Sequence, residues 1–340
     1  MTGVPHHRFI APLYFAAEKF PVSGVAAETF GTLEHALAQA TRLMDQDAVA
    51  AEAQVREILK VAPLHAQALR LLGASLRRQG RVEEADAAYM RSLEASTRDP
   101  ELIGAAQALL ANRLAEAEHT LRAILKARPT DVAAIRMLAE TAVRLGRMEA
   151  AQNLLERCVE LAPGFTAARF NYATVLYRRG QSEAAIAQTD RLLAEDPRHP
   201  GYRNLRAAAL ARIGENAQAI EAYAGVLKDF PDQPKVWMSM GHALKTVGRQ
   251  ADSIDAYRRA LKLAPSLGEA WWSLANLKTV RFTDEDAAAM AAQLARSDIS
   301  DEDRFHLEFA LGKAREDAGA FEASFGHYQR GNALRRQGLG

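Results

Sequence analysis

The chain has 340 residues with a formal net charge of +1, so its overall charge gives no case for binding nucleic acid or a membrane surface. Hydrophobic residues make up 49% of it but aromatic residues only 7%, which suits helical packing of small side chains. Its single cysteine, Cys158, excludes an internal disulfide, and we expect an inert, buried thiol.

The sequence also limits where the chain is expected to reside. No apolar run reaches the roughly 18 residues that a membrane-spanning helix needs. The apolar run at residues 9–17 contains Pro12 and is followed by Glu18 and Lys19, which makes it a poor secretory signal. We therefore expect a cytoplasmic protein.

Residues 1–31 lie outside the periodic part of the chain. They are rich in aromatic residues and contain Pro5, Pro12 and Pro21, which make a long helix unfavourable. We interpret this segment as an N-terminal arm or cap over the apolar end of the repeats that follow, because terminal units of repeat arrays are atypical. The alternative is an arm for self-association.

Residues 32–267 repeat with a fixed period. Proline recurs every 34 residues in the clearest part, and a glycine precedes each of these prolines by 17 residues. The residues are Pro163, Pro197, Pro231 and Pro265, with Gly146, Gly180, Gly214 and Gly248. Three less regular copies come first, at residues 32–65, 66–97 and 98–131; the second lacks its final proline, and the third has Asn112 in place of the glycine. Such a period indicates stacked supersecondary units.

The copy at residues 234–267 is the best preserved. It carries Trp237, Met240, Gly241, Leu244, Ser253, Tyr257, Ala260 and Pro265. These residues resemble the tetratricopeptide repeat, whose pattern is W-x2-L-G-x2-Y, then A-x3-F, then P. The resemblance implies two antiparallel helices per copy, a left-handed glycine at the turn and close helix packing at Gly241. We therefore predict an all-α, right-handed solenoid of eight or nine helix pairs without a sheet.

Residues 268–340 depart from the regular pattern and are interpreted as degenerate terminal repeats that lead toward a missing C-terminal domain. Thr283 with Asp286 predicts a helix N-cap for residues 284–296, and Ser300 or Asp301 caps the next helix. A last repeat is indicated by Gly319 and Tyr328. An array that stops there is expected to present an apolar end face.

Three stretches of this part carry a second resemblance: WWSLANLKTVRF at residues 271–282, DEDRFHLEFALGKA at 301–314 and YQRGNALRR at 328–336. They are similar to bacterial tetratricopeptide proteins whose repeat region leads into a sulfotransferase domain. The resemblance covers about residues 234–336. It implies that this chain is the non-catalytic, substrate- or partner-docking region of a sulfotransferase-type protein.

The residues give no case for catalysis in the chain itself. It contains no glycine-rich phosphate loop, no β-branched alternating run to carry one, and no zinc-binding HExxH motif. We therefore predict no catalytic residues, no cofactor and no metal. The rival hypothesis of an enzyme would be tested by binding of a donor nucleotide.

The first helix of each copy is expected to line the concave face of the solenoid, where residues at i, i+3, i+4 and i+7 lie together. Reading those positions along the copies gives a basic groove with interleaved aromatic side chains. The candidate partner-binding residues are Arg70, Arg77, Arg136, Phe170, Tyr177, Asn204, Lys235, His242, Lys245, Trp272 and Asn276.

This groove predicts a protein-binding scaffold that takes a protein or peptide partner with an acidic segment, since arginine pairs well with carboxylates. Two alternatives stay open. Cations near helix C-termini also interact favourably with the helix dipole without any ligand. A self-assembling structural scaffold is the other possibility, which makes a homo-oligomer an expected state to test.

Overall fold

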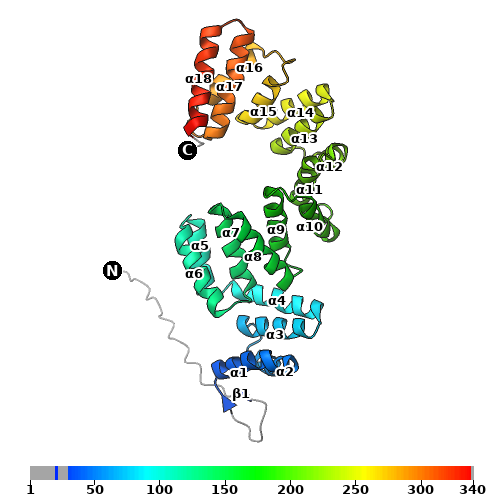
Figure 1. Ribbon diagram of the computed structural model, residues 1–340, viewed down its shortest axis with the longest axis vertical. Coiled ribbons are helices and arrows are strands. Elements are labelled where there is room, and N and C mark those ends of the chain that lie inside the picture. Colours follow the sequence, from blue (N-terminus) through cyan, green and yellow to red (C-terminus); the bar gives the residue numbers. More distant parts are fainter. Residues whose placement is uncertain (1–19, 22–29, 338–340) are drawn as a thin grey trace, which may run out of the picture. The chain divides into compact units, whose positions relative to one another are not determined.

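The computed structural model describes residues 20–21 and 30–337. These residues form eighteen α-helices and one pair of two-residue strands (Figure 1). The chain divides into two compact units, Met1–Val175 and Leu176–Gly340. We call them the N-terminal and C-terminal units and describe each by itself. The domain bounds predicted at residues 31 and 267 differ from this division and stay predictions.

The N-terminal unit contains four consecutive helix pairs. They are α1 (Leu33–Gln46) with α2 (Ala48–Val61), α3 (Ala66–Arg78) with α4 (Val82–Ser96), α5 (Pro100–Leu110) with α6 (Leu114–Ala127), and α7 (Val132–Arg144) with α8 (Met148–Leu161). Helix α9 (Thr166–Arg178) begins in this unit and ends in the next. The prediction of an all-α solenoid built from antiparallel helix pairs is confirmed.

One feature of the N-terminal unit departs from the expectation of no sheet. Strands β1 (Phe20–Pro21) and β2 (Phe30–Gly31) pair antiparallel and lie against α1. Proline has no backbone N–H to donate, so Pro21 limits how far this pairing extends. Most of the predicted N-terminal arm falls outside the described residues, so its role as cap or association arm stays a prediction.

The turns inside the helix pairs confirm the sequence prediction. Six turn glycines have φ between 74° and 92°: Gly80, Gly146, Gly180, Gly214, Gly248 and Gly319. Asn112, which takes the glycine position in the third copy, has φ 55°. A residue with a bulky side chain is strained in this left-handed region, so glycine and asparagine fix where each first helix ends.

Stacking in the N-terminal unit is interrupted after α4. The second helix of one pair normally contacts the first helix of the next, as α2 contacts α3 and α6 contacts α7. Helix α4 instead contacts α7, and among the described residues it makes no comparable contact with α5 (Figure 1). The copy at residues 66–97 lacks the final proline of the regular repeat, and this is where the stacking order changes.

Two contacts hold α4 at this junction with α7 and the turn after α8. Tyr89 is fully buried in a cluster that includes Ile135, Cys158 and Phe165. The Asp86 carboxylate accepts a hydrogen bond from the Gly164 backbone N–H, with both oxygens 3.0 Å from the nitrogen. Burial raises the pKa of the Cys158 thiol to about 12, as expected for an inert thiol.

The C-terminal unit begins with regular helices. They are α10 (Ser182–Glu195), α11 (Pro200–Arg212), α12 (Asn216–Asp229), α13 (Pro234–Thr246) and α14 (Gln250–Leu263). The close approach predicted at Gly241 is present, because a Cβ there would lie 2.6 Å from the Tyr257 ring. Ser253 Oγ donates to Gly241 O at 2.9 Å and joins the same two helices.

Trp237 differs from the sequence interpretation, which placed it with Tyr257 in the interior. Tyr257 is fully buried, but Trp237 is only half-buried. Its indole Nε1–H donates to Pro231 O at 2.8 Å, and the Arg259 guanidinium lies 4.7 Å from its ring centroid. The tryptophan therefore seals the edge of the repeat instead of filling its centre.

The unit ends with α15 (Gly268–Ala275), α16 (Asp284–Leu294), α17 (Asp301–Asp317) and α18 (Phe321–Gln337). Both predicted N-caps are confirmed: Thr283 and Asp286 form a capping box for α16, and Ser300 caps α17. Helix α15 packs on α17. The last pair repeats the contacts of α13 and α14, since Ser324 donates to Gly312 O and Gly312 packs on Tyr328.

None of the helices in the described ranges is both long enough and apolar enough to cross a membrane.

Candidate functional site

The predicted groove residues of the N-terminal unit are buried or half-buried. Arg70 is only 3% exposed, and its Nη1 lies 3.1 Å from Oδ2 of Asp131, which caps α7. The prediction that Arg70 faces a ligand is wrong, because the α7 N-terminus covers it. Its role is to form a buried ion pair.

Arg77 and Arg136 are half-buried, as is Phe170 on α9. The Nη1 atom of Arg77 is buried and has no hydrogen-bond partner among the described residues. Arg136 lies 3.9 Å from the Glu140 carboxylate and 5.9 Å from the Phe165 ring centroid. The structure therefore does not bring these cations together as an open basic groove.

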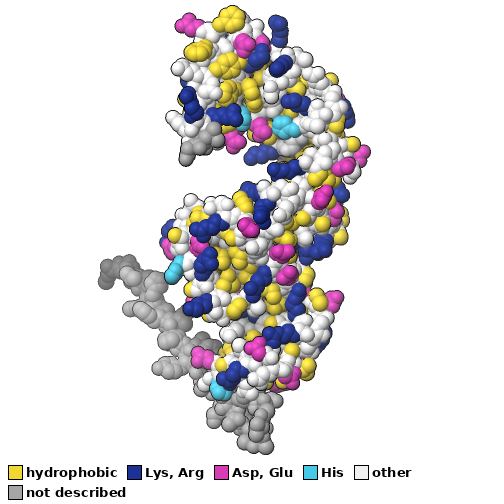
Figure 2. All heavy atoms as spheres, in the orientation of Figure 1, with side chains coloured by type: hydrophobic (Ala, Val, Ile, Leu, Met, Phe, Trp, Pro, Cys, Tyr) yellow, Lys and Arg dark blue, Asp and Glu magenta, His cyan; other side chains and the backbone are white. Residues whose placement is uncertain are grey.

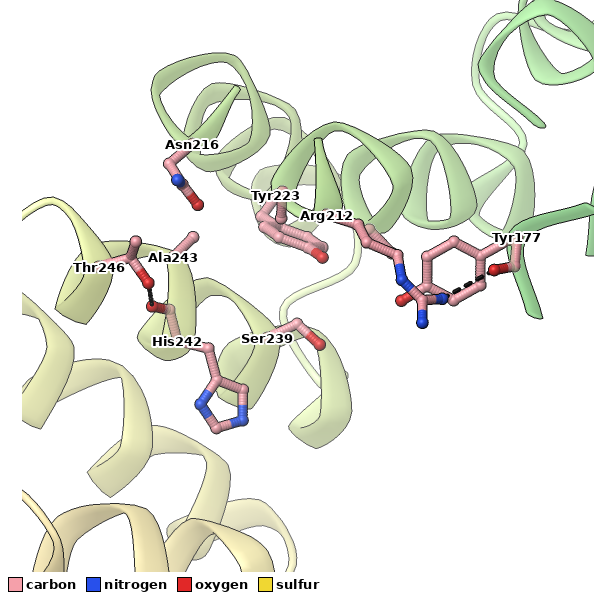
Figure 3. A pocket seen from close by; sticks show the side chains of 10 residues that line it. Tyr177, Arg212, Asn216, Tyr223, Ser239, His242, Ala243 and Thr246 are labelled. Atoms are coloured by element: carbon pink, nitrogen blue, oxygen red, sulfur yellow. Dashed lines mark hydrogen bonds between the residues drawn. The ribbon is translucent and has the colours of Figure 1, made fainter. Parts of the chain in front are cut away.

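The C-terminal unit brings Tyr177 and His242 together at a cavity of about 330 Å³ (Figure 3). Its other lining residues are Ala208, Ala211, Arg212, Asn216, Tyr223, Ser239, Ala243 and Thr246. The Arg212 guanidinium lies 5.0 Å from the Tyr177 ring centroid and donates to Tyr177 O at 2.7 Å. We call this the α11–α13 cavity.

Tyr223 also lines this cavity, although it lies on α12, the second helix of its pair, and only first helices were expected to line the concave face. Burial raises the pKa of its phenol to about 12, so the group stays neutral and can donate a hydrogen bond. Tyr257 occupies the same repeat position, but the repeat pattern alone does not show that a second helix reaches this cavity.

Lysine side chains lie on the same helices as the cavity. Lys235 is in the first turn of α13 and Lys245 in its last turn, and both are exposed. Neither forms an ion pair within the part of the chain that the structure describes. Asn204, on α11, is half-buried, and Asn276 is exposed as the C-cap of α15.

A polar chain links α13 to α15. The Tyr257 hydroxyl lies 2.8 Å from His242 Nδ1, and His242 Nε2 lies 3.5 Å from Glu269 Oε1. Interaction with His242 is the main cause that lowers the pKa of the Glu269 carboxyl, and Lys235 adds to it. Figure 2 shows histidine and cationic side chains over α13 and α15. These neighbours therefore favour the charged form of the Glu269 carboxylate.

Trp272 lies apart from the α11–α13 cavity. It lines a second cavity between α15, α17 and α18, of about 350 Å³. Among the described residues, no group of three or more His, Cys, Asp or Glu side chains is placed to hold a metal ion.

Sequence-family models described as tetratricopeptide repeat match residues 37–100, 108–158, 142–209 and 234–267, which together span more than half of the chain. The chain belongs to the tetratricopeptide-repeat family. The matched residues end at 267, so the sulfotransferase resemblance of the last part stays a prediction.

Solved structures of MamA share partial similarity with the chain. The protein "MamA 41-end from Desulfovibrio magneticus RS-1" is 17% identical, with 48% of this chain and 92% of that chain covered at a TM-score of 0.45. "Crystal structure of MamA protein" is 20% identical, with 51% and 95% covered at a TM-score of 0.45. A search of curated proteins finds no match.

Proposed function

We propose that the chain is a protein-binding scaffold and that the first-helix surface of its C-terminal unit binds an acidic segment of a partner protein. Stacked repeats present extended surfaces suited to proteins, which supports the general role. The observation that carries the finer proposal is the pair of exposed lysines on α13, Lys235 and Lys245. Neither has a carboxylate partner among the described residues, and both lie on a helix that lines the α11–α13 cavity.

The helix dipole does not account for all of these cations. Lys245 and Arg212 lie in the last turns of α13 and α11, where a positive charge stabilises the helix. Lys235 lies in the first turn of α13, where the dipole disfavours a cation. An exposed lysine at that end is therefore better explained by a ligand than by helix stability.

Ion pairs alone would bind a partner weakly, and the α11–α13 cavity offers aromatic and hydrogen-bonding contacts in addition. Exposed ion pairs each contribute about 1 kcal/mol or less, so a charged surface needs buried anchors to hold a partner. Tyr177 and Tyr223 offer aromatic faces, and His242, Ser239 and Asn216 offer hydrogen bonds. A bound segment with several such contacts is expected to reach about micromolar affinity, near −8 kcal/mol.

The test is a panel of acidic, neutral and basic peptides of equal length, measured by fluorescence anisotropy. The variant Lys235→Glu, Lys245→Glu should bind the acidic peptides at least about tenfold more weakly than wild type. Lys228→Glu, Lys262→Glu is the matched control, because both positions are exposed on second helices of the same unit. Equal binding across the panel, or equal losses in both variants, would reject the basic surface.

A second candidate function is self-assembly through α18. Phe321 and Phe325 lie one turn apart on this helix and are 70% and 69% exposed. Exposed apolar side chains of this size commonly mark association sites. Sedimentation of wild type and of Phe321→Lys, Phe325→Lys at several concentrations tests it, because only a wild-type oligomer that the variant loses would support assembly through this face.

The docking of a substrate for a sulfotransferase domain is the most specific form of the proposal. It rests on the interrupted helical segment from α15 to α16, which is unlike an ordinary repeat. Reading the gene beyond codon 340 tests it: a sulfotransferase domain in frame would support it, and a stop codon would remove the link to a fused catalytic domain.

A further inference from the structure

The cavity between α15, α17 and α18 has aromatic walls. It is lined by Trp272, Phe305, His306, Phe309, Asn332 and Arg335. The Trp272 and Phe309 ring centroids are 5.5 Å apart, and those of Phe305 and Phe309 are 6.2 Å apart in an edge-to-face arrangement. A volume of about 350 Å³ is at the lower end of the range for ligand cavities, so it suits one large side chain.

Contacts between α17 and α18 hold the walls of this aromatic cavity in place. A Cβ on Gly331 would lie 3.3 Å from Phe309, so α18 packs closely on α17 at this point. Glu308, which is buried, lies 2.6 Å from His327 Nδ1 and accepts a hydrogen bond from Arg330 Nε at 3.0 Å. These contacts join α17 to α18 beside the cavity and fix its shape before any ligand arrives.

The polar groups of the aromatic cavity are incompletely paired. Arg335 is exposed and has no carboxylate within ion-pairing distance in the described chain. His306 Nδ1 is buried without a hydrogen-bond partner there, and burial lowers the pKa of His306, which keeps the ring neutral. The indole N–H of Trp272 likewise donates no hydrogen bond to any described residue. The cavity thus offers aromatic faces, uncharged polar groups and one unpaired cation.

We propose that this cavity anchors a partner protein through one large apolar side chain, with a neighbouring carboxylate of the same segment paired to Arg335. The aromatic walls bury the apolar group, and the guanidinium recognises the carboxylate. Aromatic walls also attract cations, but Arg335 on the rim repels them, so an ammonium ligand is disfavoured. The inference names the anchor of the proposed acidic partner, and it rests on the proposed function for the source of that segment.

Electrostatic interactions connect residues of the two cavities of the C-terminal unit. His242 lines the α11–α13 cavity and lies against Glu269, and Glu269 in turn influences His306 of the aromatic cavity. The proposal is that an acidic segment bound at the lysines of α13 continues toward Arg335.

The experiment compares two dye-labelled peptides that differ at one position, one with phenylalanine between aspartates and one with alanine there. Wild type should bind the phenylalanine peptide about tenfold or more tightly. Arg335→Glu should lose this preference, whereas Arg336→Glu, the same change on the next residue of α18 and outside the cavity lining, should keep it. Asn332→Trp should fill the cavity, and the adjacent Ala333→Trp should not.

The outcomes separate this inference from the general proposal. If the two peptides bind equally, or if Arg336→Glu and Ala333→Trp lose as much as their cavity counterparts, the aromatic anchor is rejected. Charge-dependent binding that is lost only in the Lys235→Glu, Lys245→Glu variant would then leave the proposed function standing. A phenylalanine preference that survives in that lysine variant, together with undiminished affinity for both acidic peptides, would retain the anchor and reject the lysine surface.

Discussion

The cationic side chains on the first helices of the two units differ in burial and in ion pairing. In the N-terminal unit, Arg70 is buried against Asp131, and Arg136 lies beside Glu140 of its own helix. In the C-terminal unit, Lys235 and Lys245 remain exposed without a partner in the described chain. The same repeat surface therefore serves internal packing in one unit, whereas its lysines are exposed in the other.

The stacking of neighbouring pairs explains the difference. Because α4 contacts α7 and not α5, the N-terminus of α7 reaches α3 and places Asp131 on Arg70. In the C-terminal unit each pair from α10 to α15 follows the previous one, as α12 contacts α13 and α14 contacts α15. Regular stacking keeps the inner faces of the first helices free, and a change in stacking order covers them.

The largest effect is expected from breaking the buried ion pair. Asp131→Ala leaves the Arg70 charge buried without its partner and should destabilise the protein by about 3–5 kcal/mol in urea unfolding. Lys235→Met in the other unit should change stability by about 0.5 kcal/mol or less, as for an exposed residue. Comparable losses of stability in both variants would contradict the difference in cation burial between the two units.

The double variant Arg70→Leu, Asp131→Asn is the control for this test. It removes both charges together, and asparagine retains the ability to cap α7, where Asp131 Oδ1 now accepts from Ala134 N at 3.1 Å. Most of the stability lost in Asp131→Ala should return. If the double variant is no more stable than Asp131→Ala, the loss came from packing and not from the unpaired charge.

Trp237→Ala measures the packing of a regular pair in the C-terminal unit. A fully buried tryptophan would cost about 3–5 kcal/mol, and the half-burial observed here reduces the expected loss to roughly 2 kcal/mol. The loss includes the stacked Arg259 guanidinium and the hydrogen bond to Pro231. A loss under about 1 kcal/mol would show that the indole does not seal the repeat.

Gly164→Ala tests the contact that holds the changed stacking order. A Cβ there would overlap Asp86 Oδ2, so the carboxylate must move and its hydrogen bond to the Gly164 N–H is lost. We expect a loss of about 1–2 kcal/mol. Gly104→Ala is the control, since a Cβ on that glycine meets nothing within 4 Å, and in helix α5 it should be neutral or stabilising.

Features that depend on local sequence were predictable. The turn residues Gly146 and Asn112 take the left-handed conformation that their positions require, and Thr283 caps the helix that follows it. Gly241 meets Tyr257 because both belong to one copy of the repeat. Each of these outcomes is decided within a single helix pair, where the repeat pattern applies directly.

Features that join separate copies were not predictable in the same way. The partner of Arg70 is Asp131, the last residue of the next copy and the cap of α7, and the contact arises only because α4 meets α7. The aromatic cavity forms because α15 ends at Ala275 and packs on α17, which brings Trp272 to Phe309. A repeat pattern fixes which side chains share a helix face but does not fix which helix covers that face.

The smallest expected effect concerns Glu269, a carboxylate that lies near His242 and is influenced by Lys235. The lowered pKa of Glu269 means that its charged form is favoured in the folded protein, so its contribution to stability is present above its unfolded pKa of about 4.5 and is lost as the pH falls through the lower folded value. Glu269→Gln should therefore remove part of the acid sensitivity of unfolding below about pH 4.5.

At neutral pH the same variant should bind acidic peptides about two- to threefold more tightly, because the screened repulsion between Glu269 and the peptide carboxylates disappears. Urea unfolding between pH 3 and pH 7 and the peptide titration check the two effects. An unchanged pH profile together with weaker acidic-peptide binding would show that Glu269 supports the ligand surface instead of opposing it.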